Sequence, residues 1–128
     1  MPTIRQLDPS DTSFSADAYA PQIEAALEYA PDTYSVDDVI GLIKAGDAVM
    51  FECDGSVVVA SIIEYPQSRT LSLWLGAGDM GTVLKLKSHA ESWGRINNCS
   101  HAQVLGRKGW ARSLVDYDEA AVLLRRKL

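Results

Sequence analysis

Two amphipathic helices are predicted in the N-terminal part of the chain. Over residues 16–29, apolar side chains recur at steps of three and four residues, which places them on one face of a helix. They are Tyr19, Ile23, Ala26, Leu27 and Ala30. Pro31 and Asp32 end this helix. A second helix is predicted from Ser35, a favourable N-cap, to Gly46, a typical C-terminal residue.

The middle of the chain is rich in β-branched and other apolar residues, which is typical of strands. Strands are predicted over residues 3–7, 48–53, 56–65 and 70–75. Asp54 and Gly55 form the strongest hairpin signal in the chain. The strand that follows this turn is apolar on both faces, so we expect it to lie in the centre of a sheet.

The remaining pattern predicts a long helix and a second β-segment. Glycines after residue 75 break the third strand of the meander, and an amphipathic helix is predicted from there to Arg95. A strand over residues 100–105, a short helix over 110–115 and a last strand over 119–124 follow. The predicted order is therefore β-α-α-β-β-β-α-β-α-β.

This order predicts the fold class. The strand–helix–strand run over residues 70–105 requires a parallel pair with a right-handed crossover. An antiparallel meander that leads into one parallel pair makes a mixed α/β sheet with helices on both faces. The length of 128 residues fits a single domain over residues 1–128.

Composition and charge narrow the class of protein. Hydrophobic residues make up 47% and charged residues 23%, as in ordinary globular proteins. The 12 Lys and Arg residues against 17 Asp and Glu residues give a net charge of −5, which argues against binding of nucleic acid or anionic membrane by the whole surface. No apolar run reaches the length of a membrane span, and no signal-peptide pattern occurs, so we expect an intracellular protein.

Cysteine and histidine residues offer little chemistry. Cys53 and Cys99 lie in no CxxC pair, and free thiols are the simpler interpretation. Cys99 as a nucleophile beside His101 is the alternative, but their spacing is not a catalytic geometry by itself. His89 and His101 are the only histidines, so a histidine-rich metal site is excluded and no metal is expected.

Two local motifs resemble a known family. Residues 71–79 read LSLWLGAGD and precede the long helix with Trp93, and residues 106–114 read GRKGWARSL. With the predicted element order, they resemble GNAT-like (Gcn5-related N-acetyltransferase-like) proteins encoded by tailed bacteriophages. The resemblance spans nearly the whole chain, and residues 106–114 are its most specific part. It implies a GNAT-like fold, and some of these phage proteins are acetyltransferases whereas others are virion or assembly proteins.

The resemblance also implies a place for acetyl-CoA. GNAT enzymes hold the pyrophosphate on N–H groups at the start of the helix after the fourth strand. The matching residues here are Leu75, Gly76, Ala77, Gly78, Asp79, Met80 and Gly81. The family's usual Arg or Gln is missing from this loop, and Asp79 can cap the same N–H groups and repel a phosphate. A self-capped turn and an acyl-CoA site both remain open.

Acid–base residues are carried over in the same way. The resemblance implies a glutamate in the central strands as general base and a tyrosine as proton donor to the thiolate. Glu64 and Tyr117 are the candidates; Glu52 lies nearer a turn, and Tyr117 is two residues beyond the family's position. The alternatives are a solvated carboxylate and a tyrosine of the core or its rim.

A basic cluster and three tryptophans complete the candidates. Arg107, Lys108 and Arg112 can contact CoA phosphates, a nucleic acid or an acidic partner, or form a solvated face. The tryptophans are expected to pack in the core.

Two functions follow from the resemblance. The first is an acetyl-CoA-dependent N-acyltransferase that acts on an amine. The second is a catalytically inactive GNAT-like virion or assembly protein, with other phage proteins as partners. Both imply the cytoplasm of the bacterial host, and the second also implies incorporation into the virion.

Overall fold

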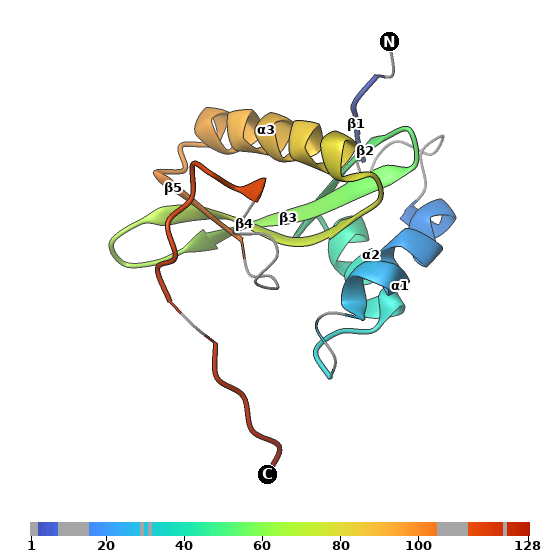
Figure 1. Ribbon diagram of the computed structural model, residues 1–128, viewed down its shortest axis with the longest axis horizontal. Coiled ribbons are helices and arrows are strands. Elements are labelled where there is room, and N and C mark those ends of the chain that lie inside the picture. The colour runs from blue at the N-terminus through green and yellow to red at the C-terminus, as the bar shows by residue number, and fades with distance from the viewer. Residues whose placement is uncertain (1–2, 8–15, 29, 31, 105–112, 122) are drawn as a thin grey trace.

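The computed structural model describes residues 3–7, 16–28, 30, 32–104, 113–121 and 123–128. One five-stranded sheet forms its centre, with the strands in chain order from edge to edge (Figure 1). They are β1 (Arg5–Gln6), β2 (Val49–Cys53), β3 (Ser56–Glu64), β4 (Arg69–Ala77) and β5 (His101–Val104). The strand predicted to be central, β3, lies between β2 and β4.

Strand directions confirm the predicted mixed α/β fold. Strands β1 to β4 pair antiparallel, and β5 pairs with β4 in parallel. The helix α3 (Met80–Ile96) connects β4 to β5, as the predicted crossover requires. β1 is shorter than predicted, with two residues paired to β2.

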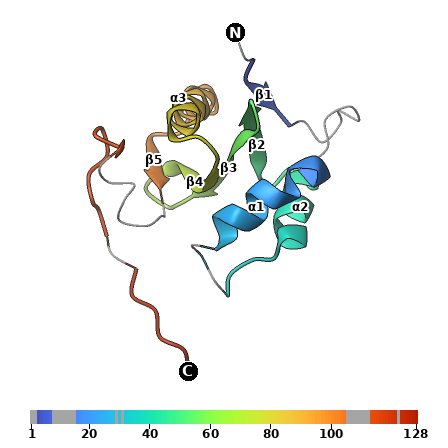
Figure 2. The same ribbon diagram turned by 45° about the vertical axis from the view of Figure 1, so that its right-hand side comes forward.

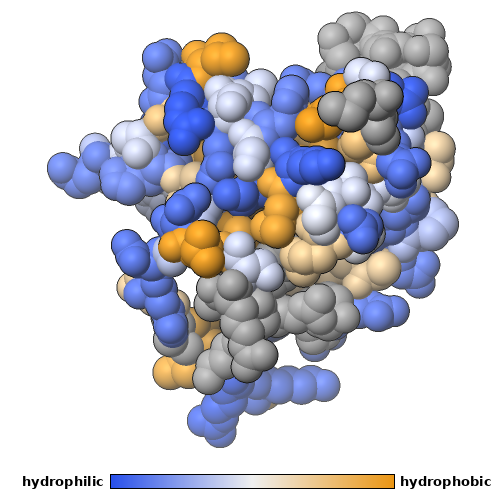
Figure 3. Space-filling view, turned by 45° about the horizontal axis from the view of Figure 1, so that its top comes forward, coloured by the Kyte–Doolittle hydropathy of each residue, from blue (hydrophilic) through white to orange (hydrophobic). Residues whose placement is uncertain are grey.

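Helices cover both faces of the sheet, as predicted. Figure 2 shows α1 (Ala20–Leu27) and α2 (Val36–Lys44) on one side and α3 on the other. Neighbouring residues of a strand therefore enter different cores: Met50 packs with Ile23 and Ile43 in the first core, and Phe51 packs with Leu86 in the second. Figure 3, with the α3 side turned forward, shows mostly hydrophilic side chains with small apolar patches between them.

Local chemistry sets where the helices begin. The helix predicted over residues 16–29 consists of a 3₁₀ turn, η1 (Ala16–Tyr19), followed by α1, whose first turn contains Pro21. Proline is tolerated there because the first N–H groups of a helix have no intrahelical partner. Ser35 caps α2 in a capping box with Asp38, as its sequence signal predicted. None of the helices in the described ranges is both long and apolar enough to span a membrane.

The last predicted strand is not formed. The described residues of 119–124 belong to no strand, and Leu123 and Leu124 are 64% and 88% exposed. Figure 1 shows this segment leaving the sheet. An apolar run becomes a strand only when its N–H and C=O groups pair with a neighbouring strand, and this segment has no such partner among the described residues. The short helix predicted over residues 110–115 lies largely outside the described residues.

Candidate functional site

β4 continues past the end of β5. β5 pairs with β4 from Thr70 to Leu73, whereas β4 runs on to Ala77. At the same point the register between β4 and β3 shifts. The neighbouring β3 residues Val59 and Ala60 pair with Leu75 and Leu73 of β4, and the pairing skips the β4 residue between them. Trp74 is therefore the extra residue of a β-bulge, a feature that redirects side chains and backbone groups.

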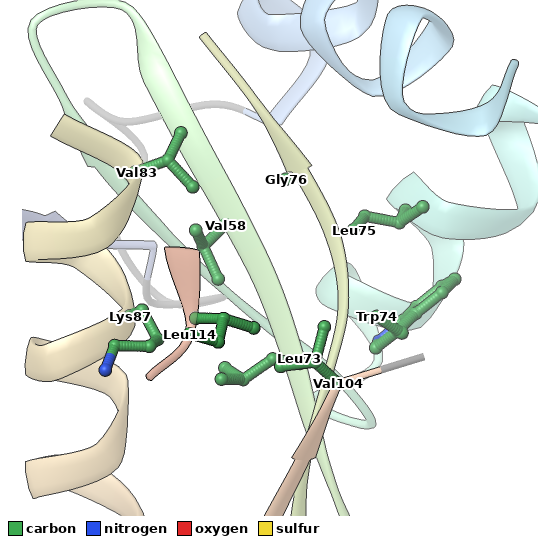
Figure 4. Close-up of a pocket in the computed structure, with 9 residues that line it drawn as sticks. All are labelled: Val58, Leu73, Trp74, Leu75, Gly76, Val83, Lys87, Val104 and Leu114. Carbon is green, nitrogen blue, oxygen red and sulfur yellow. The ribbon is translucent and has the colours of Figure 1, made fainter. Parts of the chain in front are cut away.

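A cavity lies beside this part of β4. Its empty volume is about 380 Å³, part of it open to solvent. The lining residues, drawn in Figure 4, are Val58, Leu73, Trp74, Leu75, Gly76, Val83, Lys87, Val104 and Leu114. Leu73 belongs to the core under α3 and Leu75 to the core under α1 and α2, so the cavity reaches both sides of the sheet. A mostly apolar lining with one cation suits an organic chain with few polar groups.

The end of β4, the turn after it and the start of α3 hold most of the predicted cofactor-binding residues. Leu75 and Gly76 line the cavity, and Ala77 packs against the first core. Gly78, Asp79, Met80 and Gly81 are exposed. Because Gly76 and Val83 both line the cavity, it extends to the first turn of α3.

Asp79 caps α3. Its Oδ2 accepts hydrogen bonds from the Thr82 N–H at 3.0 Å and the Thr82 hydroxyl at 3.1 Å. The Asp79 N–H donates to the Ser56 Oγ at 3.1 Å. The N–H groups of Met80 and Gly81, at the first two helical positions, donate to no described residue. They remain available to an anion, while the Asp79 charge opposes one.

Gly78 holds this loop against β3. Its φ of +124° is a conformation that other residues avoid, and a Cβ there would lie 2.2 Å from the Ser56 Oγ. The glycine is thus required both by the backbone conformation and by close contact with Ser56.

Tyr117 lies over α3, and it is not among the residues that line the cavity. Its hydroxyl donates to the Glu91 Oε2 at 2.7 Å, and the Lys87 Nζ lies 5.5 Å from its ring centroid. The pKa of the Tyr117 phenol is raised, mainly by burial and to a smaller extent by the hydrogen bond to Glu91. Since Leu114 lines the cavity, the bond from Tyr117 to Glu91 ties this cavity wall to α3.

Comparisons with solved structures identify the architecture. An aminoglycoside acetyltransferase from an uncultured soil metagenomic sample, in complex with sisomicin, is similar with a TM-score of 0.70, 15% identity and coverage of 99% of this chain and 96% of that chain. A GCN5-related N-acetyltransferase from Ralstonia eutropha JMP134 gives 0.73, 13% identity and coverage of 99% of both chains. The aminoglycoside N-acetyltransferase AAC(6')-Iy in complex with CoA gives 0.68, 15% identity and coverage of 99% of this chain and 95% of that chain.

The chain has the GNAT acetyltransferase fold. At these identities the likeness concerns the fold alone. No protein-family model matches the sequence, and no curated protein matches it either.

The structure does not bring Glu64 to the cavity of this GNAT fold. Glu64 is exposed at the end of β3, where it pairs with Arg69 at the start of β4. The cavity residue Val58 is six positions away along the same strand, about 20 Å at the usual rise per residue. Glu52 is buried instead, with its Oε2 3.0 Å from the Arg5 Nε.

Arg107 and Arg112 lie outside the described residues, as does Lys108, so their predicted contacts with CoA phosphates stay predictions. In the described part of the chain, no group of three or more histidine, cysteine, aspartate or glutamate residues could hold a metal ion.

Sequence reasoning missed Trp74, Lys87 and Leu114 as cavity residues of the GNAT fold. The sequence predicts Trp74 in the core with the other tryptophans, whereas Trp74 is half-buried and lines the cavity. The bulge that places Trp74 here is a pairing property of β3 and β4, so no local signal announces it.

Proposed function

We propose that the protein is an N-acyltransferase that transfers the acetyl group of acetyl-CoA to an amine. The observation that carries the proposal is the mostly apolar cavity at the end of β5, which is lined by Gly76 near the end of β4 and by Val83 in the first turn of α3. A relative in fold, AAC(6')-Iy, is known in complex with CoA.

The residues from the end of β4 to the start of α3 fit such a cofactor. Leu75, Gly76 and Ala77 would flank its pantetheine arm along the free part of β4. The N–H groups of Met80 and Gly81 would bind a phosphate, with Arg107 and Arg112 as the cations of the predicted site. Gly78 and Asp79 set the loop conformation that exposes these groups.

When bound, acetyl-CoA supplies an acetyl thioester. A C–N bond forms between the amine nitrogen and the acetyl carbon, and the C–S bond breaks. An ammonium acceptor releases two protons in all, one taken by the sulfur to give CoA-SH and one by the solvent. Neither Glu64 nor Tyr117 lines the cavity, so we give neither of them a proton-transfer step.

Acetyl-CoA binding tests the proposal directly. We expect a saturable rise in the melting temperature, since a ligand at 100 times its Kd stabilises the folded state by about 2.7 kcal/mol. Asp79→Asn keeps a capping oxygen and removes the charge, so we expect acetyl-CoA to bind about fivefold more tightly. Asp47→Asn, in the turn after α2, is the charge control and should leave the affinity unchanged. Absence of any shift at millimolar acetyl-CoA would contradict the proposal.

A non-catalytic virion or assembly protein of a tailed phage is the second candidate. One observation favours it: the turn before α3 satisfies its own groups without a ligand, because Asp79 accepts the Thr82 N–H bond and Gly78 packs on Ser56. In that case acetyl-CoA produces no thermal shift, and mass spectrometry finds the protein in purified virions or assembly intermediates of the phage that encodes it. Its absence from all of them would contradict this candidate.

A further inference from the structure

We propose that the aromatic pair Tyr34–Trp74 forms the acceptor site and selects a cationic amine. The inference rests on the proposed function and names the class of its second substrate. It assigns the role to two side chains that come from the α1–α2 connection and from the bulge of β4.

Trp74 places the pair at the wall of the cavity. Trp74 lines the cavity, and Figure 4 shows it with Leu75 on the opposite side of β4 from Val83 and Lys87. The Tyr34 ring lies 5.0 Å from the Trp74 ring, centroid to centroid, at an interplanar angle of 53°. Tyr34 is 49% exposed, so a molecule from solvent can reach the pair.

Trp74 also holds an unused hydrogen-bond donor. Its Nε1 is buried and has no partner among the described residues. A buried donor without an acceptor is unfavourable, so a bound hydroxyl or carbonyl oxygen at this position would be stabilised. The pair therefore presents an aromatic face at the cavity, and the Trp74 indole keeps one buried N–H group without a partner among the described residues.

The surrounding charge favours a cation. Residues 28–38 contain Glu28, Asp32, Asp37 and Asp38, and no lysine or arginine. All four carboxylates are on exposed residues, and the hydrogen bonds of Asp38 with Ser35 lower its pKa and keep it ionised. A primary amine is an ammonium ion at neutral pH, and aromatic faces attract such ions. These four acidic residues lie within six positions of Tyr34 along the chain, so they favour a cationic acceptor over a neutral one near it.

Calorimetry with the full chain tests this selection without requiring turnover. Tyramine and tyrosol differ in the ammonium group that tyrosol replaces with a hydroxyl, and spermidine is an aliphatic cation. We expect tyramine and spermidine to bind in the presence of CoA, and tyrosol to bind at least about fivefold more weakly than tyramine. Equal affinities for tyramine and tyrosol would overturn the proposal.

Variants locate the binding to the pair. Tyr34→Ala should weaken tyramine binding by about two- to fivefold, whereas Tyr34→Phe keeps the aromatic face and the affinity.

A charge variant tests the acidic surroundings of Tyr34. Asp32 has a φ of +62°, which asparagine tolerates, so Asp32→Asn removes one charge without disturbing the fold. It should weaken binding by about twofold at low salt, and Asp47→Asn should have no effect. Unchanged affinity in both Tyr34→Ala and Asp32→Asn would overturn the proposal.

The two proposals fail separately. If acetyl-CoA binds but no cationic amine binds or is acetylated, the acceptor assignment is wrong and the cofactor site stands. If acetyl-CoA does not bind, the proposed function is wrong, and amine binding that depends on Tyr34 still supports a cation site at the pair.

Discussion

Single residues at the start of α3 decide how β4 turns into that helix. Gly78 adopts a positive φ and packs on Ser56, and Asp79 caps the helix. The N–H groups of Met80 and Gly81 donate to no residue in the described part of the chain. These four residues therefore determine both the stability of this turn and its ability to bind an anion.

Gly78→Ala should destabilise the protein by about 2–3 kcal/mol, because alanine is strained at this φ and its Cβ would overlap Ser56. Gly41→Ala is the matched control: it lies within α2 with no atom within 4 Å of its new Cβ, and it should stabilise by about 0.5–1 kcal/mol. Urea denaturation measures both. Equal free energies of unfolding for the two variants would contradict the close contact at Gly78.

Tyr117→Phe should destabilise by about 1–2 kcal/mol, since it removes the hydrogen bond to Glu91. The raised pKa of Tyr117 also gives this contribution a pH dependence. In the unfolded chain the phenol has its ordinary pKa of 10.0, which is below its pKa in the folded protein. The contribution is therefore complete below about pH 10 and is lost as the pH rises further. The difference in stability between wild type and Tyr117→Phe should therefore narrow above pH 10, as urea denaturation at several pH values can measure. A constant difference would argue against the buried bond.

Some secondary-structure elements can be predicted from local residue patterns alone. The side-chain N-caps of α2 and α3, the β2–β3 hairpin and the central position of β3 follow from local residue types and are present. The segment over residues 119–124 has a similarly apolar composition but forms no strand in its described residues. A cap or a tight turn is satisfied by atoms within a few residues, whereas a strand depends on a partner elsewhere.

Ser35→Ala should destabilise the protein by about 1 kcal/mol, because it removes the side-chain acceptor for the Asp38 N–H in the capping box of α2. Ser35→Asn retains an acceptor and should remain within about 0.5 kcal/mol of wild type. Thermal denaturation followed by circular dichroism compares the two. If alanine and asparagine were equally stable, the cap would contribute nothing in solution.

At the scale of the whole molecule, two cores enclose the sheet and the tail lies outside both. Helices α1 and α2 cover one face and α3 the other, while Leu123, Leu124 and Leu128 are exposed by 64% or more. The folded unit in this structure is thus built without its last described residues.

Deletion of residues 119–128 should change the free energy of unfolding by less than about 0.5 kcal/mol, since the described residues of this segment are exposed and exposed residues contribute little. Equilibrium urea denaturation of the shortened and full chains measures the difference. Deletion of residues 113–128 is the comparison, because it also removes buried Leu114 and the Tyr117 bond, and it should be clearly destabilising. A large loss from the shorter deletion would mean that residues 119–124 pair with the sheet in solution.

Local residue patterns are enough to predict the order of elements through β5, the single mixed sheet, the helix caps and the turn after β4, because periodicity, caps and turns are local properties of the chain. The remaining features depend on tertiary contacts. Pairing of β3 with β4 creates the bulge at Trp74, the short β5 leaves the cavity, and packing sends Glu64 to Arg69 and Tyr117 to Glu91. These contacts join residues far apart in the chain, and local residue patterns do not specify which distant side chains meet.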